Sequence, residues 1–218
     1  FNVVGANTLT VSNNLTTDGT GGGLTKNGTG TLTLSGAGNT YTGATAINAG
    51  TLKFQANTFN ATSRNYTIAS GAVLNLDGAN VFAVGNSTIS GTGKLLITGG
   101  TLSGQTAASP TNVGNISLGS GGTIEIASGA TLYNGGWNSV YWASNLADIT
   151  VDGSLDIAGG RTVIVDALTG SGTVDKTAAG TVTLLVGVDN GSGTFSGIIK
   201  NTSGATALTK NGSGTQIL

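Results

Sequence analysis

The sequence contains no cysteine, histidine or methionine, only one proline, and charged residues at just 8% of its 218 positions. Without cysteine and histidine, the chain cannot form a disulfide framework, a Cys/His zinc site, a thiolate nucleophile or a histidine-based catalytic triad. The net charge of −1 provides no basic field for binding nucleic acid or anionic lipid. No apolar run reaches the roughly 18 residues of a membrane-spanning helix, so we expect no membrane insertion by this segment.

Glycine is abundant, with 39 residues, and together with asparagine it interrupts every candidate helical pattern. Short runs with an alternation of apolar and polar residues recur instead, each bounded by Gly, Asn, Ser or Asp. This pattern is typical of short strands with one buried face, so the chain is predicted to be all-β with little or no helix. The clearest runs are 31–34, 51–54, 73–76, 123–126, 154–157, 162–165 and 181–184.

Sequence phrases around these runs also recur. Residues 89–95 match 168–174, and residues 24–32 return as 208–217. Hairpins in a β-sandwich and a parallel β-solenoid both fit short strands with glycine turns. The solenoid is favoured for two reasons. Stacked coils place equivalent side chains about 4.8 Å apart, where repeated charges would repel each other, and this chain has few charges. A narrow solenoid interior also accommodates aliphatic side chains better than rings, and this chain has few aromatic residues. We predict one β-solenoid domain over 1–218, with roughly ten coils of about 20 residues.

Residues 24–36, 39–45 and 47–52 closely resemble the passenger-associated repeat, or autotransporter-associated β-strand repeat, of bacterial autotransporters and other secreted surface proteins. The best copy is 24–54, a weaker copy is 180–197, and a truncated copy is 208–218. The resemblance implies a right-handed parallel β-helix that is extracellular or on the cell surface of a Gram-negative bacterium. In that family the repeat is associated with passenger folding and export and is not itself an active site.

The truncated copy at 208–218 leaves two interpretations open. The chain is a segment of a longer repeat protein whose next coils continue the stack, or separate subunits stack end to end into a fibre. The expected partners are therefore neighbouring repeats or copies of the chain itself, through open solenoid ends. A host surface or glycans are further candidate partners.

One aromatic stretch breaks the repeat rhythm and holds both tryptophans. Its members Tyr133, Trp137, Tyr141 and Trp142 are candidate contacts for a glycan or a partner protein, because exposed rings stack on sugars and anchor interfaces. The alternative is that these rings pack a local bulge of the solenoid.

The densest acidic cluster is Asp148, Asp152 and Asp156, with Asp166 further along and Arg161 as the only arginine nearby. Carboxylates can bind calcium on a β-helix face, and lyases with this fold combine calcium with a basic residue, but Asp before a glycine turn more often forms the turn. The turn interpretation is favoured, and no catalytic residue, metal site or cofactor is predicted.

The predicted function is therefore that of a non-catalytic extracellular structural or adhesive β-solenoid. The alternative is a carbohydrate-binding or carbohydrate-active β-helix centred on the aromatic stretch and 148–166. A minor alternative is an ice-binding solenoid, because Thr-x-Thr pairs occur at 8/10, 31/33 and 181/183.

Overall fold

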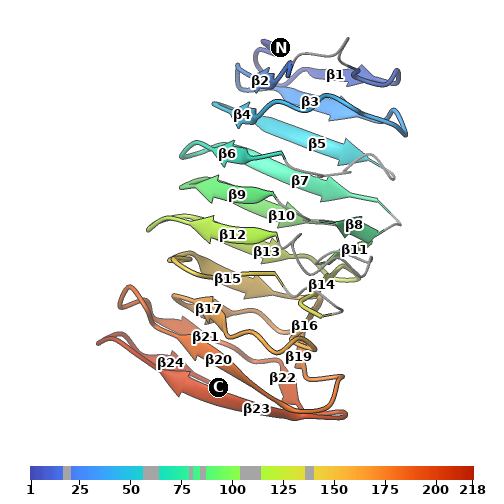
Figure 1. Ribbon diagram of the computed structural model, residues 1–218. Helices are drawn as coiled ribbons and strands as arrows, with labels where there is room; N and C mark the ends of the chain where they lie inside the picture. The colour runs from blue at the N-terminus through green and yellow to red at the C-terminus, as the bar shows by residue number, and fades with distance from the viewer. Residues whose placement is uncertain (17–20, 56–63, 79–80, 84–86, 104–113, 136–139) are drawn as a thin grey trace.

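The computed structural model describes residues 1–16, 21–55, 64–78, 81–83, 87–103, 114–135 and 140–218. These residues form strands that stack one above another from the N-terminus to the C-terminus (Figure 1). Within the described ranges the chain forms no helix, and thus none long and apolar enough to cross a membrane. The prediction of an all-β chain is confirmed.

Each coil contributes strands to up to three faces. The first face is an eight-stranded sheet, in spatial order β1 (Thr8–Val11), β3 (Thr31–Leu34), β5 (Thr51–Gln55), β7 (Val73–Asp77), β10 (Lys94–Ile97), β13 (Thr123–Ile126), β15 (Asp148–Val151) and β18 (Leu168–Thr169). The second face is a six-stranded sheet of β8 (Val81–Ala83), β11 (Thr101–Ser103), β14 (Thr131–Tyr133), β16 (Ser154–Asp156), β19 (Thr173–Asp175) and β22 (Ile198–Lys200).

The third face is a five-stranded sheet of β2 (Leu24–Lys26), β4 (Thr45–Ile47), β6 (Tyr66–Ile68), β9 (Thr88–Gly91) and β12 (Asn115–Leu118). Two smaller sheets follow towards the C-terminus. One contains β17 (Val163–Val165), β20 (Thr181–Val186) and β23 (Ala205–Lys210), and the other contains β21 (Gly193–Thr194) and β24 (Gln216–Ile217). A parallel bridge from Gly170 to Phe195 links the β21 segment to the end of the first face.

Every strand pair is parallel, and each partner lies one coil further along the chain. Thr31 pairs with Thr51, and Thr51 pairs with Val73. This pairing confirms the solenoid and excludes the sandwich of hairpins, whose neighbouring strands would be antiparallel. The stack has about eight turns, fewer than the ten expected, because pairs such as Lys94 with Thr123 enclose coils longer than about 20 residues. The right hand of the coil stays a prediction.

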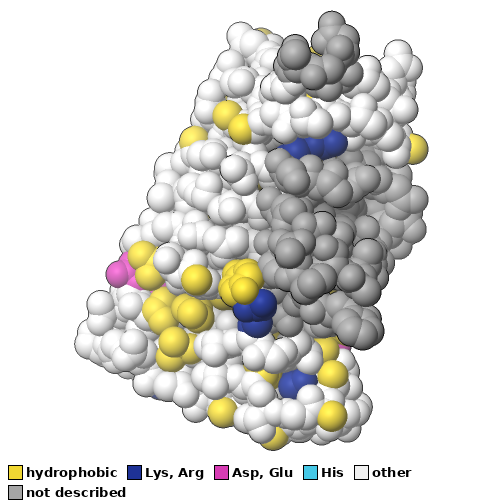
Figure 2. All heavy atoms as spheres, viewed as in Figure 1, with side chains coloured by type: hydrophobic (Ala, Val, Ile, Leu, Met, Phe, Trp, Pro, Cys, Tyr) yellow, Lys and Arg dark blue, Asp and Glu magenta, His cyan; other side chains and the backbone are white. Residues whose placement is uncertain are grey.

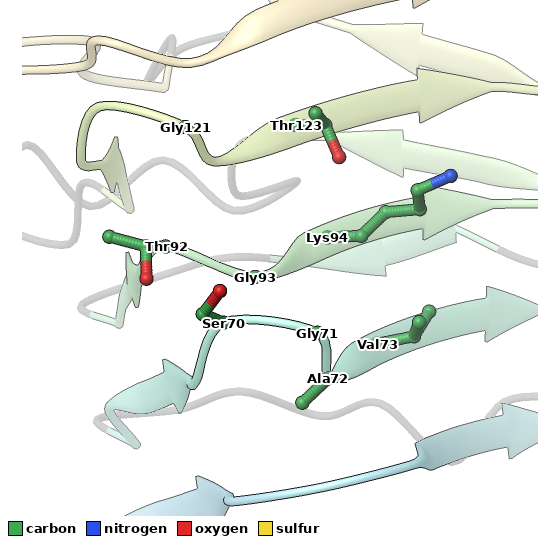
Figure 3. Close-up of a pocket in the computed structure, with 9 residues that line it drawn as sticks. All are labelled: Ser70, Gly71, Ala72, Val73, Thr92, Gly93, Lys94, Gly121 and Thr123. Carbon is green, nitrogen blue, oxygen red and sulfur yellow. The ribbon is translucent and has the colours of Figure 1, made fainter.

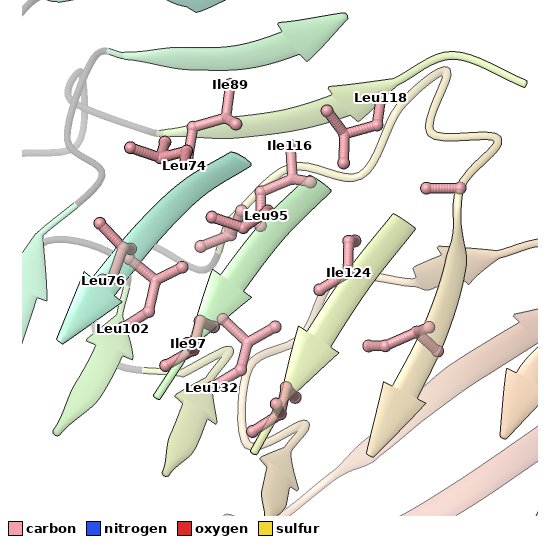
Figure 4. Close-up of a cluster of buried hydrophobic side chains, with 14 of the residues drawn as sticks. Leu74, Leu76, Ile89, Leu95, Ile97, Leu102, Ile116, Leu118, Ile124 and Leu132 are labelled. Atoms are coloured by element: carbon pink, nitrogen blue, oxygen red, sulfur yellow. The ribbon is translucent and has the colours of Figure 1, made fainter. Parts of the chain in front are cut away.

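Like residues stack on like residues inside the coil. On the first face one inward column is completely buried, because alternate side chains of a strand point to opposite faces. Side chains from all three faces meet in this interior (Figure 4), so one aliphatic core runs along the stack and supplies its main stabilisation. The column consists of Leu32, Leu52, Leu74, Leu95, Ile124, Ile149 and Leu168.

Glycines at the corners between faces let successive coils approach closely. A Cβ at Gly153 would lie 2.3 Å from the carbonyl oxygens of Ala127 and Ala130, and one at Gly172 would lie 2.2 Å from the oxygen of Gly153. Real Cβ atoms do not approach backbone oxygen that closely. The high glycine content is therefore a packing requirement of the corners.

The third face is interrupted between β12 and β17, where a buried side chain replaces a strand. The Leu118 N–H donates to Oδ1 of Asn145 (3.1 Å), and Nδ2 of Asn145 donates to the Ile164 carbonyl (2.8 Å). The side-chain amide thus acts as a peptide group and satisfies backbone groups that would otherwise be buried without partners.

Candidate functional site

The aromatic candidates lie in different environments. Trp142 is buried, with 1% of its surface exposed, and belongs to the aliphatic core. Tyr133, the last residue of β14, is half-buried and stands beside Asp156 of β16. Trp137 lies outside the described residues. The three described side chains therefore do not form one continuous exposed surface.

Of the three members that the structure describes, Tyr141 is the exposed one, with 40% of its surface accessible. The guanidinium carbon of Arg161 lies 3.4 Å from the centre of the Tyr141 ring, which is a cation–π contact between two successive coils. One side of the ring is therefore covered by Arg161. The arrangement combines a phenol and a cation at the lateral surface, a pairing that suits a polar or acidic ligand.

The acidic candidates accept hydrogen bonds from the following coil. Oδ1 of Asp152 accepts from the N–H (3.0 Å) and the hydroxyl (3.1 Å) of Ser171. Oδ2 of Asp156 accepts from the Thr177 hydroxyl at 2.6 Å. These contacts are those of residues that order a turn, and they favour the turn interpretation.

Asp166 and Asp148 follow the same pattern. Oδ1 of Asp166 accepts from the N–H groups of Asp189 (2.6 Å) and Gly191 (2.8 Å), and Oδ1 of Asp148 accepts from the Ala167 N–H (3.0 Å). Among the described residues, no three carboxylates are grouped so that they could hold a metal ion.

Two carboxyl groups have pKa values that differ from the usual range in opposite directions. Burial raises the pKa of Asp148, and the carboxylates of Asp166 and Asp189 raise it further, although the Ala167 N–H opposes the shift. Burial would also raise the pKa of Asp175, but hydrogen bonds from Thr202 and the Lys200 ammonium outweigh it, so this pKa is lowered.

Shallow hollows lie where the corner glycines leave space. One is lined by Ser70, Thr92 and Thr123 together with Gly71, Gly93 and Gly121 (Figure 3). Lys94 also lines the hollow, and its ammonium forms an ion pair with Oε2 of Glu125 at 2.8 Å on the first face. The hollow holds hydroxyl groups but neither an acid–base pair nor an exposed ring, so it lacks the polar convergence of a catalytic pocket.

The threonine pairs do not form the flat array that ice binding needs. The column of Thr8, Thr31 and Thr51 continues as Val73 and Lys94. In the neighbouring column Thr33 is buried and is followed by Lys53. Along the described coils of the first face, threonine is therefore not repeated for more than a few coils.

Two fully buried lysines are features that the sequence analysis did not identify. Lys26 has 0% of its surface exposed, and its ammonium donates to the carbonyls of Asn27 (2.9 Å), Gly28 (2.7 Å) and Ala49 (3.0 Å). The first two acceptors belong to the turn after the lysine and the third belongs to the next coil. An ammonium has three donors, so all are satisfied, and burial lowers the pKa of Lys26.

Lys176 is held in the same way at another corner. Its ammonium donates to the carbonyls of Ala158 in the preceding coil (2.7 Å) and of Ala178 (2.7 Å) and Ala179 (3.3 Å) in its own turn. Lys26 is the last residue of β2 and Lys176 directly follows β19, and each lysine precedes four residues that end in glycine, after which a Thr-apolar-Thr-Leu strand begins. That shared spacing is the sequence signal by which both lysines could have been identified.

Comparison with known proteins supports the resemblance at one place in the chain. The protein-family model described as passenger-associated-transport-repeat matches residues 24–54, which include Lys26, the strands β2 to β4 and all of β5 except Gln55. The predicted resemblance over 24–54 is confirmed, while the copies at 180–197 and 208–218 stay predictions. No curated protein and no solved structure matches the chain.

The two shifted carboxyl groups predict opposite effects of pH on stability. The raised pKa of Asp148 penalises the folded state above that pKa, and the penalty disappears below the usual Asp pKa, about 3.9. Asp148→Asn should therefore raise the thermal midpoint at pH 7 and have little effect in acid. The lowered pKa of Asp175 stabilises the folded state above the usual pKa, so Asp175→Asn should lower the midpoint at pH 7. Thermal unfolding from pH 7 to pH 3 tests this, and shifts of equal sign at pH 7 would contradict it.

Because the buried lysines satisfy backbone carbonyls, we expect removal of a buried ammonium to destabilise the fold. Lys176→Met should lower the free energy of unfolding by about 2–4 kcal/mol, because three carbonyls lose a donor while a buried charge is also removed. Denaturant unfolding at low protein concentration measures this difference. Lys210→Met is the control, since Lys210 is exposed and its loss should cost within about 0.5 kcal/mol. Equal stability of Lys176→Met and the unaltered chain would refute the structural role of the ammonium.

Proposed function

We propose that this chain is a structural, non-catalytic segment of a secreted or surface-displayed passenger of a Gram-negative bacterium. The observation that carries the proposal is the passenger-associated-transport-repeat match at 24–54, which covers two successive coils of the continuous stack. Such a repeat in a parallel β-solenoid is typical of an autotransporter passenger. The repeat also occurs in other large secreted bacterial proteins, so either kind of passenger fits.

The stack itself supplies the mechanism. Each coil offers the next one a row of backbone N–H and C=O groups and an aliphatic interior, so folding can proceed by adding coil to coil. The hydrogen bonds then run along the long axis of the molecule, as between Thr51 and Gly30 (3.1 Å) and between Val73 and Gly50 (2.9 Å). Chain emerging outside the cell can fold in this order without an external energy source.

The lateral surface fits a structural or adhesive role. On the face shown in Figure 2 the described part is mostly uncharged, and a few Lys, Arg, Asp and Glu side chains and several hydrophobic side chains lie among polar groups and backbone. Some of the charges are paired across coils, as in the ion pairs Lys53–Asp77 and Lys94–Glu125. A surface of this kind extends from the cell without strong repulsion between coils, and it can present polar ridges to a host surface or to other copies.

Display on living cells tests the proposed function. The chain is placed between an export signal and a translocator barrel in a Gram-negative host, and surface exposure is measured with antibody and with protease added to intact cells. We expect the chain to reach the surface and resist the protease. Gly153→Val should reach the surface in a protease-sensitive form, because its side chain would meet the carbonyls of Ala127 and Ala130. Retention of the unaltered chain inside the cell, or equal protease sensitivity of the unaltered chain and Gly153→Val, would contradict the proposal.

A second candidate function is glycan binding at Tyr141 and Arg161, which the exposure of this ring and its adjacent cation support. An acidic polysaccharide could bind the guanidinium while its sugar ring packs against the phenol. Calorimetry with acidic and neutral polysaccharides should then show binding that Tyr141→Ala weakens at least tenfold. Tyr133→Ala is the matched control and should leave it unchanged. Absence of binding, or equal loss in both variants, would eliminate this candidate.

A further inference from the structure

The outward column of the third face changes character in the C-terminal half of the chain. After the interruption at Asn145, the strands β17 and β20 carry Ile164 and Leu185 at register-paired positions. Both side chains are half-buried while the residues on either side of each one are buried, so they point away from the core. From β2 to β12 the equivalent outward positions carry small, mostly hydroxyl-bearing side chains, namely Thr25, Ala46, Thr67, Ser90 and Ser117.

These aliphatic side chains belong to a larger apolar area. Tyr141, with 40% of its surface exposed, and Ala143, also exposed, lie in the preceding coil, whose Asn145 amide donates to the Ile164 carbonyl (2.8 Å). Figure 2 shows hydrophobic side chains gathered on this part of the viewed face, with Lys or Arg atoms on one side of them and Asp or Glu atoms on the other. We call the group of Tyr141, Ala143, Ile164 and Leu185 the apolar patch.

Opposite charges lie at the two edges of the apolar patch. Arg161 lies just before β17 begins and is stacked on the Tyr141 ring. Asp148 and Asp189 lie at the other edge, where the third face turns into the first. There Oδ1 of Asp148 accepts from the Ala167 N–H (3.0 Å) just after β17, and Asp189 follows the end of β20. The ion pairs among the described residues involve none of these three charged side chains.

This arrangement is self-complementary for one symmetry. A two-fold axis that lies in the interface and runs parallel to the stack places the beginning of each strand over the end of the same strand in a second copy. The basic edge then meets the acidic edge twice, and the aliphatic columns meet in the middle. A two-fold axis along the strands would instead place the two Arg161 side chains together and the two acidic edges together, which repulsion between like charges opposes.

We propose that the apolar patch binds the same patch of a second copy of this chain, as a side-by-side dimer whose two stacks run in the same direction. Ile164 and Leu185 lie near the two-fold axis and exclude water there, while Arg161 of each copy faces Asp148 and Asp189 of the other. The contact is isologous, so it closes at two copies. It uses the lateral surface alone and does not rest on the function proposed above.

Sedimentation velocity of the chain over a range of concentrations tests the association. We expect a monomer–dimer equilibrium, and Leu185→Ser should weaken dimerisation about tenfold because an aliphatic contact is lost from the centre of the interface. Leu96→Ser is the matched control, since Leu96 is also an outward, half-buried leucine but lies on the first face, and it should dimerise like the unaltered chain. A monomer at every concentration, growth beyond the dimer, or equal dimerisation of the two variants would overturn the proposal.

Charge reversal tests the register independently. Arg161→Asp places acidic groups against acidic groups and should weaken the dimer, whereas Arg161→Asp with Asp189→Arg exchanges the two edges and should restore it. The control is Arg161→Asp with Asp152→Arg, which regains the same net charge at an exposed corner between the first and second faces and should not restore the dimer. The exchange removes the cation from the Tyr141 ring, so it restores dimerisation without restoring glycan binding. Equal dimerisation of the two double variants would contradict the register.

Discussion

Backbone hydrogen bonding between successive coils is the constraint on which the rest of the molecule depends. Parallel pairing places each residue over its counterpart one coil earlier, as Leu95 lies between Leu74 and Ile124. A side chain is therefore acceptable only if it can be repeated, or complemented, at the strand spacing of about 4.8 Å. Aliphatic residues satisfy this condition inside, and threonine, serine and asparagine satisfy it outside.

The scarcity of charge follows from the same constraint, and the charges that are present show how it is managed. Asp156 and Asp175 are register partners. Each carboxylate accepts a hydrogen bond from a threonine hydroxyl, that of Thr177 for Asp156 and that of Thr202 for Asp175. Asp175 also pairs with Lys200 at 3.2 Å. The repulsion between like charges in one column is thus reduced by hydrogen-bond donors and an ammonium group close to each carboxylate. The buried lysines are the complementary case, because an ammonium inside a corner binds carbonyl oxygens that point inward.

The periodicity of the sequence was sufficient to predict the strands and the parallel stack, because alternation and repetition are local properties, whereas the passenger repeat was predicted from the resemblance of residues 24–54 to a known family. The number of turns was overestimated, since an average coil length ignores longer coils such as the one between Lys94 and Thr123. The sequence left open whether the rings of the aromatic stretch are exposed or packed, so it could not assign the burial of Trp142, and it gave no sign that Asn145 replaces a strand. Both depend on which side chain faces the interior at an irregular coil, and such a coil has no repeat to fix its register.

Nuclear Overhauser contacts in solution test the parallel in-register stack most directly. The account predicts contacts between the methyl groups of Leu74 and Leu95 and between those of Leu95 and Ile124, which are register partners in successive coils. Short Hα–Hα contacts between sequentially neighbouring runs, such as 94–97 and 101–103, are the signature of an antiparallel hairpin. Observation of these Hα–Hα contacts, together with absence of the methyl contacts, would contradict the parallel in-register stack.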